Sequence, residues 1–73
     1  MIDFELVRVS SSNLHSVGYD PASQTLRIKF RDGGVYDYYN VPVSRYTGLM
    51  SSGSKGSYHA NHIKDHYRYR RIR

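Results

Sequence analysis

Apolar and polar residues alternate most regularly between Thr25 and Arg31. The apolar positions are Leu26, Ile28 and Phe30, and the polar positions are Arg27, Lys29 and Arg31. Alternation at a period of two residues predicts a β-strand with one buried and one exposed face.

A second strand is predicted from Leu14 to Asp20, because the polar, proline-containing segment 20–24 after it favours a turn. In the hairpin that results, Tyr19 is expected opposite Leu26, and Val17 opposite Ile28. The segment 1–10 is weakly patterned, although Leu6, Val7 and Val9 favour a short additional edge strand.

The tyrosine-rich segment 35–39 predicts a third strand, and its register depends on the turn before it. Two-residue turns at 32–33 or 33–34 would both place the Asp37 carboxylate on the apolar face, where an unpaired charge costs several kcal/mol. A three-residue loop, 32–34, instead sets Asp37 opposite Lys29, a favourable cross-strand charge pair. Such loops usually need a residue with positive φ, which glycine supplies. The apolar pairs predicted by this register are Phe30 with Tyr36 and Ile28 with Tyr38.

Two short helices are expected after the sheet. Pro42 suits the first turn of a helix, and the residues expected to face the sheet are Val43, Tyr46, Leu49 and Met50. The Ser/Gly-rich segment 51–57 interrupts this helix, and a second one is expected to begin near Ser57, a good N-cap. The residues expected to point inward from it are Ala60, Ile63 and Tyr67. The end of the chain, 68–73, is typical of a short extended segment or a frayed tail.

The predicted fold class is therefore α+β: a three-stranded antiparallel β-meander with two short helices on its one apolar face. The side chains expected to be least exposed are Val17, Tyr19, Ile28, Phe30, Tyr36, Tyr38, Tyr46, Leu49 and Ile63. Replacing Phe30 with alanine is expected to cost about 3–5 kcal/mol, as for buried aromatic residues in general.

Size limits the organisation to a single domain, residues 1–73, with a core from about 9 to 72. A chain this short buries only about 60% of its unfolded surface. It has no cysteine, so disulfides and thiolate metal sites are excluded, and its eight tyrosines supply large rings for packing. No apolar run approaches the ~18 residues of a membrane span, and residues 1–5 are acidic where a signal peptide is basic. A cytoplasmic location is expected.

The net positive charge of the chain suggests a polyanion as a candidate partner. The formal net charge is +5 and the pI is about 9.7, and the last ten residues hold five basic side chains and one acid. Such a balance permits polyanion binding.

Motifs along the chain resemble one family, the KTSC domain. They are the Arg31–Pro42 stretch, Ser11-Ser12-Asn13, Gly18-Tyr19-Asp20, Ile63-Lys64 and Tyr67-Arg68-Tyr69. That domain takes its name from the carboxy-terminal end of some lysyl-tRNA synthetases and also occurs alone as a small bacterial or phage protein. The resemblance covers about Val9 to Ile72 and implies RNA binding. The family's Tyr-x-Tyr motif falls on Tyr36-Asp37-Tyr38.

Histidines and serines suggest two other chemistries. His59, His62 and His66 recur at helical spacing, and His62-x-x-x-His66 has a zinc-ligand spacing. With no cysteine and no suitable carboxylate beside them, a solvated helix surface is favoured, and no metal or cofactor is expected. There is no Gly-x-Ser-x-Gly elbow and no carboxylate pair at a plausible cleft, so no catalytic residue and no enzymatic activity are expected.

A basic and aromatic surface is the favoured candidate site. Arg27, Lys29 and Arg31 recur at about 6.6 Å along one strand, near the phosphate spacing of an extended single strand. Tyr39 on the same face could stack on a base. Lys55 stands at the start of the second helix, and the tail adds Arg68, Arg70, Arg71 and Arg73. The competing interpretation is that strand cations only prevent edge-to-edge aggregation. If the helices covered the other sheet face, Tyr36 and Tyr38 would form the binding platform.

The functional hypothesis is a small non-catalytic module that binds RNA or single-stranded DNA weakly and mainly by electrostatics. No helix carries the basic stripe of a major-groove reader. The alternative is a protein-interaction or self-assembly module, as a homodimer or docked on a larger protein through an open edge strand. No membrane partner is expected.

Overall fold

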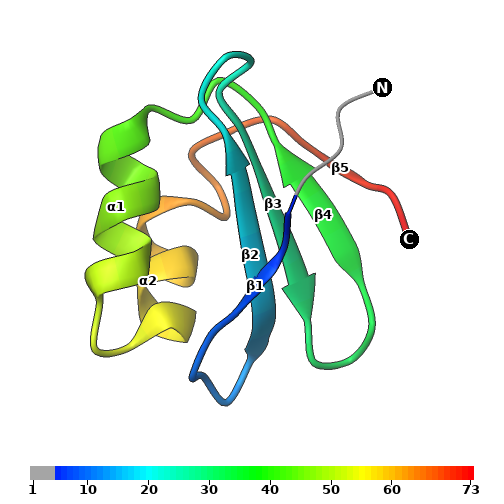
Figure 1. Ribbon diagram of the computed structural model, residues 1–73, viewed down its shortest axis with the longest axis vertical. Coiled ribbons are helices and arrows are strands. Elements are labelled where there is room, and N and C mark those ends of the chain that lie inside the picture. The colour runs from blue at the N-terminus through cyan, green and yellow to red at the C-terminus, as the bar shows by residue number, and fades with distance from the viewer. Residues whose placement is uncertain (1–4) are drawn as a thin grey trace.

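The computed structural model describes residues 5–73, so most of the acidic amino terminus considered above lies outside the described residues. The chain forms a five-stranded antiparallel sheet in the order β1-β2-β3-β4-β5, with two helices packed against one face (Figure 1). The strands are β1 (Val7–Arg8), β2 (Leu14–Asp20), β3 (Thr25–Phe30), β4 (Val35–Tyr38) and β5 (Tyr69–Arg71), and the helices are α1 (Val43–Ser51) and α2 (Lys55–His62). Among residues 5–73, neither helix has the length and apolar character needed to cross a membrane.

The α+β class, the central meander and its two helices are confirmed, and the sheet has two more strands than the meander. β1 is the short edge strand that the apolar residues near Val7 favoured, and it pairs with β2. β5 pairs with β4 through Tyr38 and Tyr69, among others. The end of the chain is therefore an extended strand, and the frayed-tail interpretation is wrong.

The first hairpin has the predicted register, with Tyr19 opposite Leu26 and Val17 opposite Ile28. Its one irregularity is a β-bulge between Leu14 and Ser16. The extra residue in the bulge is His15.

The second hairpin differs from the prediction by two residues, since Ile28 lies opposite Tyr36 rather than Tyr38. The loop does have three residues, but they are 31–33. The Gly33 N–H donates to the Phe30 carbonyl at 3.0 Å, and Gly33 takes a φ of +99°. A tight turn followed by a glycine with positive φ is a favoured three-residue hairpin loop. Because the shift is even, every side chain keeps its predicted face.

The core lies between the helices and one face of the sheet, as expected. Its buried residues are Leu14, Val17, Leu26, Ile28, Tyr38, Val41, Leu49 and Ile63. Four residues expected among the least exposed, Tyr19, Phe30, Tyr36 and Tyr46, are only partly buried. Branched aliphatic side chains fill the centre, and the larger aromatic rings lie around it with one edge exposed.

The first helix has the predicted phase, since Tyr46, Leu49 and Met50 pack on the core. Val43 alone differs: it is the first residue of α1, after the N-cap Pro42, and is 57% exposed. The second helix differs from the prediction in phase. α2 begins at Lys55, before Ser57, and Ala60 is exposed. The inward positions at this end are His59 and Ile63, one helical turn apart. Tyr67 lies beyond α2 and is partly buried against the core.

Candidate nucleic-acid interface

The sheet face away from the helices, here called the outer face, carries the predicted strand cations. Arg27 does not offer an isolated positive charge to a phosphate, because it forms an ion pair with Asp37. Its Nε donates to Asp37 Oδ1 at 2.7 Å and its Nη2 to Asp37 Oδ2 at 2.9 Å, from the neighbouring strand. The side chains are 24% and 10% exposed, respectively. Asp37 therefore pairs with Arg27 rather than with Lys29, and Arg27 connects β3 to β4 and stabilises the sheet.

Lys29 and Arg31 remain on the outer face. Lys29 is half-buried, whereas Arg31 is exposed at the start of the hairpin loop. The Arg31 Nε donates to the Ser11 carbonyl at 2.7 Å, and its main-chain N–H donates to the Asn13 carbonyl at 2.9 Å. These bonds fix Arg31 beside the segment that enters β2.

His15 completes this surface and was not among the sequence candidates. Its Nδ1 lies 3.0 Å from the Ser16 hydroxyl oxygen. Desolvation lowers the pKa of His15, and the charges of Lys29, Arg8 and Arg31 lower it further. Three cations therefore surround one imidazole, and we call these four residues the basic cluster. Within residues 5–73, no carboxylate forms a salt bridge with any of them. A β-bulge places His15 here, and strand alternation alone cannot predict one.

A second group of predicted residues meets at the other end of β4. A shallow groove of about 420 Å³ is lined by Tyr39, Asn40, Arg68, Tyr69 and Arg70. The Tyr39 N–H donates to the Arg68 carbonyl at 2.9 Å, so the pairing of β5 with β4 continues to this point. Three candidates far apart in the sequence, Tyr39, Arg68 and Arg70, are thus neighbours.

The other predicted cations lie apart from these groups. Arg71 is opposite Tyr36 on β4, with its Cζ 5.6 Å from the centre of that ring, which places it toward the helices. The Arg71 Nε donates to the Arg73 carbonyl at 3.0 Å. Lys55 donates from Nζ to the Ser52 carbonyl at 3.1 Å, so its ammonium is directed back onto the loop before α2.

The three helix histidines do not form one surface. His59 is 6% exposed, and its Nε2 lies 2.8 Å from the Tyr38 hydroxyl oxygen. His62 is exposed and packs on Tyr58, with ring centres 4.6 Å apart. The solvated-surface interpretation is wrong for His59, because this residue lies on the inward side of α2 and its imidazole is paired with Tyr38. In the part of the chain that the structure describes, no three potential ligands cluster as a metal site.

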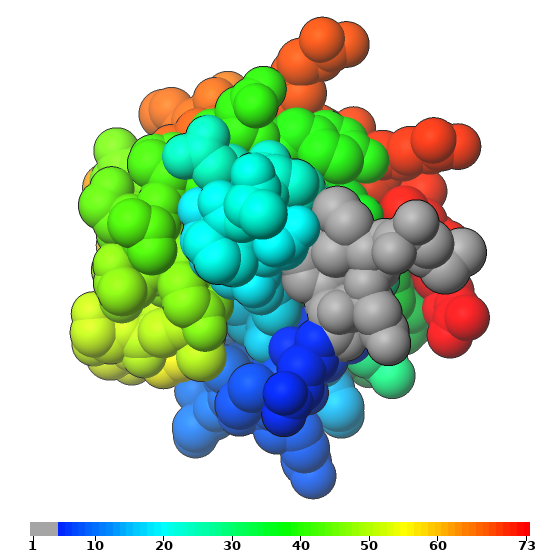
Figure 2. Space-filling view, turned by 45° about the horizontal axis from the view of Figure 1, so that its top comes forward, coloured from blue at the N-terminus to red at the C-terminus, as the bar shows by residue number. Residues whose placement is uncertain are grey.

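Comparisons with known proteins agree with this architecture. The family model described as the KTSC domain matches residues 10–67. A crystal structure of a KTSC domain protein from Yersinia pestis superposes with a TM-score of 0.93 at 38% identity, covering 97% of this chain and all of that one. In the space-filling view of this fold, the helical residues (green to yellow) and the carboxy-terminal residues (red) lie on opposite sides of the molecule (Figure 2).

Sequence relatives are of two kinds. An uncharacterized protein of Stutzerimonas stutzeri is 41% identical over 68 residues, which is 90% of this chain and 94% of that protein. A lysine–tRNA ligase of a Nostoc species is 32% identical over 72 residues, and the chain spans 13% of that ligase's length. The family model covers residues 10–67 and the short relative covers 90% of this chain, so the chain belongs to the KTSC domain family.

Proposed function

We propose that this domain is a non-catalytic module that binds RNA or single-stranded DNA on the outer face of its sheet. The observation that carries the proposal is the basic cluster, Arg8, His15, Lys29 and Arg31. Desolvation lowers the pKa of His15, and the charges of Lys29, Arg8 and Arg31 lower it further. A surface that concentrates cations, none of them in a salt bridge within residues 5–73, attracts a polyanion. Phosphate contacts supply most of non-specific nucleic-acid affinity.

Two further observations favour RNA over other polyanions. Tyr39 lies beside Arg68 and Arg70, a combination of stacking ring and phosphate-binding guanidinium groups that is typical of single-strand binders. The lysine–tRNA ligases that contain a similar segment act, by their name, with a tRNA. Binding is expected to be weak and strongly salt-dependent, because neither group forms a deep cleft.

The test is the salt dependence of binding to short single-stranded RNA and DNA. Replacing Arg8, Lys29 and Arg31 together with glutamine removes about three phosphate contacts. The slope of log affinity against log salt should flatten by about two units, at about 0.7 per contact for single strands. Tyr39→Ala should weaken binding through lost stacking and leave the slope nearly unchanged.

Two single substitutions provide a matched control. Lys29→Gln and Lys55→Gln each remove one positive charge, but Lys55 is held on the loop before α2. Lys29→Gln should reduce affinity and Lys55→Gln should have little effect. Equal effects would mean that net charge, and not the outer face, governs binding. If the wild-type protein binds no nucleic acid even at low salt, the proposal fails.

A protein-interaction module is the second candidate. Both edges of the sheet are short strands, and Val7 on β1 and Tyr69 on β5 are large exposed apolar residues. Exposed edges can accept a partner strand. A concentration-dependent dimer in solution, abolished by Val7→Lys, would support self-assembly through β1.

A further inference from the structure

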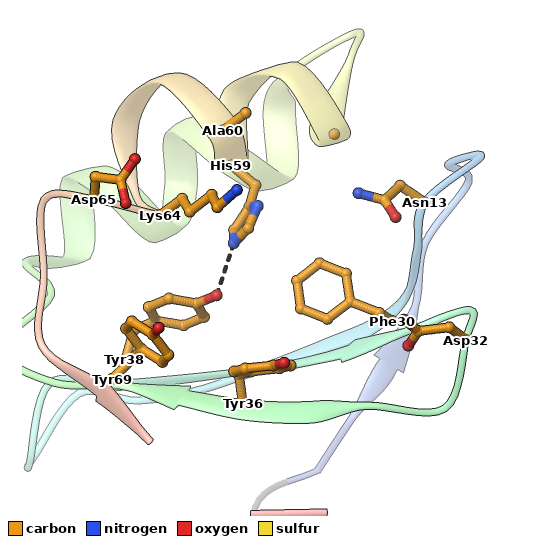
Figure 3. Close-up of a pocket in the computed structure, with 11 residues that line it drawn as sticks. Asn13, Phe30, Asp32, Tyr36, Tyr38, His59, Ala60, Lys64, Asp65 and Tyr69 are labelled. Carbon is orange, nitrogen blue, oxygen red and sulfur yellow. Dashed lines mark hydrogen bonds between the residues drawn. The ribbon is translucent and has the colours of Figure 1, made fainter. Parts of the chain in front are cut away.

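An open pocket of about 360 Å³ lies on the helix side of the sheet, away from the basic cluster (Figure 3). Tyr36 and Tyr38 of β4 form its floor, with ring centres 6.4 Å apart and planes 26° apart. Tyr69 of β5 lies against both rings, and Phe30 stands nearly perpendicular to Tyr36, at 84°. The family's two tyrosines therefore present aromatic surface to a cavity, although they are on the core side of the sheet.

α2 forms the roof and leaves room beneath it. Gly56 and Ala60, one turn apart, line the pocket with almost no side chain. Between them in the sequence, His59 is fixed by its bond to the Tyr38 hydroxyl. This bond, 2.8 Å between Nε2 and the hydroxyl oxygen, connects the roof to the floor at one side of the open space.

Polar groups at the two ends of the pocket have unused hydrogen-bonding capacity. Asn13 and Asp32 lie at one end and Lys64 and Asp65 at the other (Figure 3). Asp32 accepts from the Gly34 N–H through Oδ1, at 2.9 Å. Within residues 5–73, its Oδ2 and the side-chain polar atoms of the other three make no hydrogen bond. The ends thus offer both donors and acceptors.

This combination favours a neutral, planar, polar-edged ligand. The two carboxylates of the pocket ends are balanced by two cations, the Lys64 ammonium and the Arg71 guanidinium over the Tyr36 ring. With no net charge around the pocket, neither an anionic nor a cationic ligand is favoured. A volume near the lower end of the ~300–1,000 Å³ range for ligand sites leaves room for a small ring system. A nucleobase has two aromatic faces for stacking and an edge of donors and acceptors.

We propose that this pocket receives one unstacked nucleobase of a bound single strand, an inference that rests on the proposed function for the strand. Adjacent residues connect the two surfaces. Arg31 belongs to the basic cluster, and Asp32, the next residue in the sequence, lines the pocket. The Arg31 N–H also donates to the carbonyl of Asn13, another pocket residue. A strand that follows the basic cluster around the β3–β4 hairpin reaches the pocket mouth. Arg71, over the Tyr36 ring, is placed to meet the adjoining phosphate.

The test fills the pocket without touching its floor. Ala60→Leu puts a larger side chain into the roof at an exposed helical position, and Asn61→Leu is the matched control on the neighbouring residue. Each protein is titrated with a short single-stranded RNA and with an abasic sugar-phosphate chain of equal length and charge. All three proteins also carry Tyr39→Ala, so that stacking in the groove beside β5 does not contribute. The parent protein and Asn61→Leu should then prefer the RNA by about 5- to 150-fold, the range expected for one stacked base. Ala60→Leu should lose that preference and keep the abasic affinity and its salt slope.

The outcomes separate the two proposals. If Ala60→Leu retains the preference, the pocket inference is wrong while the nucleic-acid proposal stands. If neither the RNA nor the abasic chain binds, the proposed function fails, and the pocket is then tested alone by titration with AMP and UMP. Shifts of the Tyr36 and Tyr38 resonances that are absent in Ala60→Leu would support a base site. Without such shifts, or with saturation by tetramethylammonium instead, the nucleobase inference is overturned.

Discussion

The Tyr38 hydroxyl oxygen lies 2.8 Å from Nε2 of His59, in a buried contact that joins β4 to α2. Burial raises the pKa of Tyr38 to about 12, with smaller contributions from Tyr36, Tyr69 and Asp65. Burial also lowers the pKa of His59, and the Lys64 charge lowers it further, while Asp65 opposes this effect. At neutral pH both groups are therefore uncharged, and the tautomer of the imidazole determines which of them donates in the hydrogen bond.

Stability should therefore fall on mild acidification. The pKa of His59 in the folded state is below its unfolded value of 6.5, so below that pH the unfolded chain binds a proton that the folded chain resists. The contribution is complete above pH 6.5 and is lost progressively below it. Because the pocket admits solvent, the slope should stay below the ~1.4 kcal/mol per pH unit of one full proton. Urea unfolding at pH 7.5, 6.5 and 5.5 measures it.

Histidine variants identify the group responsible. His59→Gln should flatten this dependence, since glutamine does not titrate. His15, whose pKa is also lowered, changes stability in the same direction, so His15→Gln should flatten it only in part. A free energy of unfolding that rises from pH 7.5 to 5.5 would contradict the assignment.

Arg27 and Lys29, two residues apart on the outer face, should differ in their effect on stability. Arg27→Gln leaves the Asp37 carboxylate buried without its bidentate partner, which should cost about 1–3 kcal/mol. Lys29→Gln should stay within about 0.5 kcal/mol, as surface substitutions usually do. Chemical denaturation of both variants checks this. Equal losses would show that the Arg27–Asp37 pair contributes nothing beyond surface charge.

The two helices pack so closely that replacing Gly48 with alanine should destabilise the protein, although alanine is normally preferred to glycine within a helix. Gly48 lies within α1, where alanine normally stabilises by about 1 kcal/mol. Here a Cβ at Gly48 would overlap the Tyr58 hydroxyl and lie 2.7 Å from its ring carbon Cζ. Gly48→Ala should therefore lower the melting temperature, and combining it with Tyr58→Leu should recover part of the loss. A melting temperature above the wild-type value for Gly48→Ala alone would show that Tyr58 moves aside freely.

Strand alternation predicted which face each side chain occupies, but it could not set the register of the second hairpin. A shift of two residues leaves the pattern of faces unchanged, so polarity alone cannot detect it. The carboxylate argument correctly required a cation opposite Asp37, and two cations on the same face, Arg27 and Lys29, satisfied it equally. The start of α2 was misplaced because Ser54 and Ser57 are both acceptable N-caps. Its inward face was misplaced because polarity favoured Ala60 over His59, which is buried.

The sequence predicted that the candidate interface is basic, but it did not identify all the residues that form it. The basic outer face follows from the strand pattern. The proximity of Tyr39 to Arg68 and Arg70 does not, because it depends on the pairing of β5 with β4. The part played by His15 depends on a bulge, and that of Arg8 on pairing between β1 and β2. The pocket was missed because Phe30 and Tyr36 are apolar-face residues, and their pattern does not reveal that α2 carries Gly56 and Ala60 above them.

The carboxy-terminal segment is an integral part of the sheet, so its removal should destabilise the fold. Tyr69–Arg71 forms β5, the Ile72 N–H donates to the Val35 carbonyl at 2.8 Å, and Tyr69 packs 5.7 Å from Tyr38. Deleting residues 69–73 removes these bonds and exposes the edge of β4. The melting temperature should fall by about 10 °C or more, since each kcal/mol is worth about 4–8 °C in a small domain.

A charge-only variant separates this structural role from binding. Arg70→Gln with Arg73→Gln keeps β5 and removes two charges, so its melting temperature should stay within a few degrees of the wild type. Affinity for single-stranded RNA should nevertheless fall, because Arg70 lines the groove beside Tyr39. If the deletion melts like the wild type, β5 does not stabilise the sheet. The contribution of the tail to binding should therefore be measured with the glutamine variant, because the deletion changes charge and fold together.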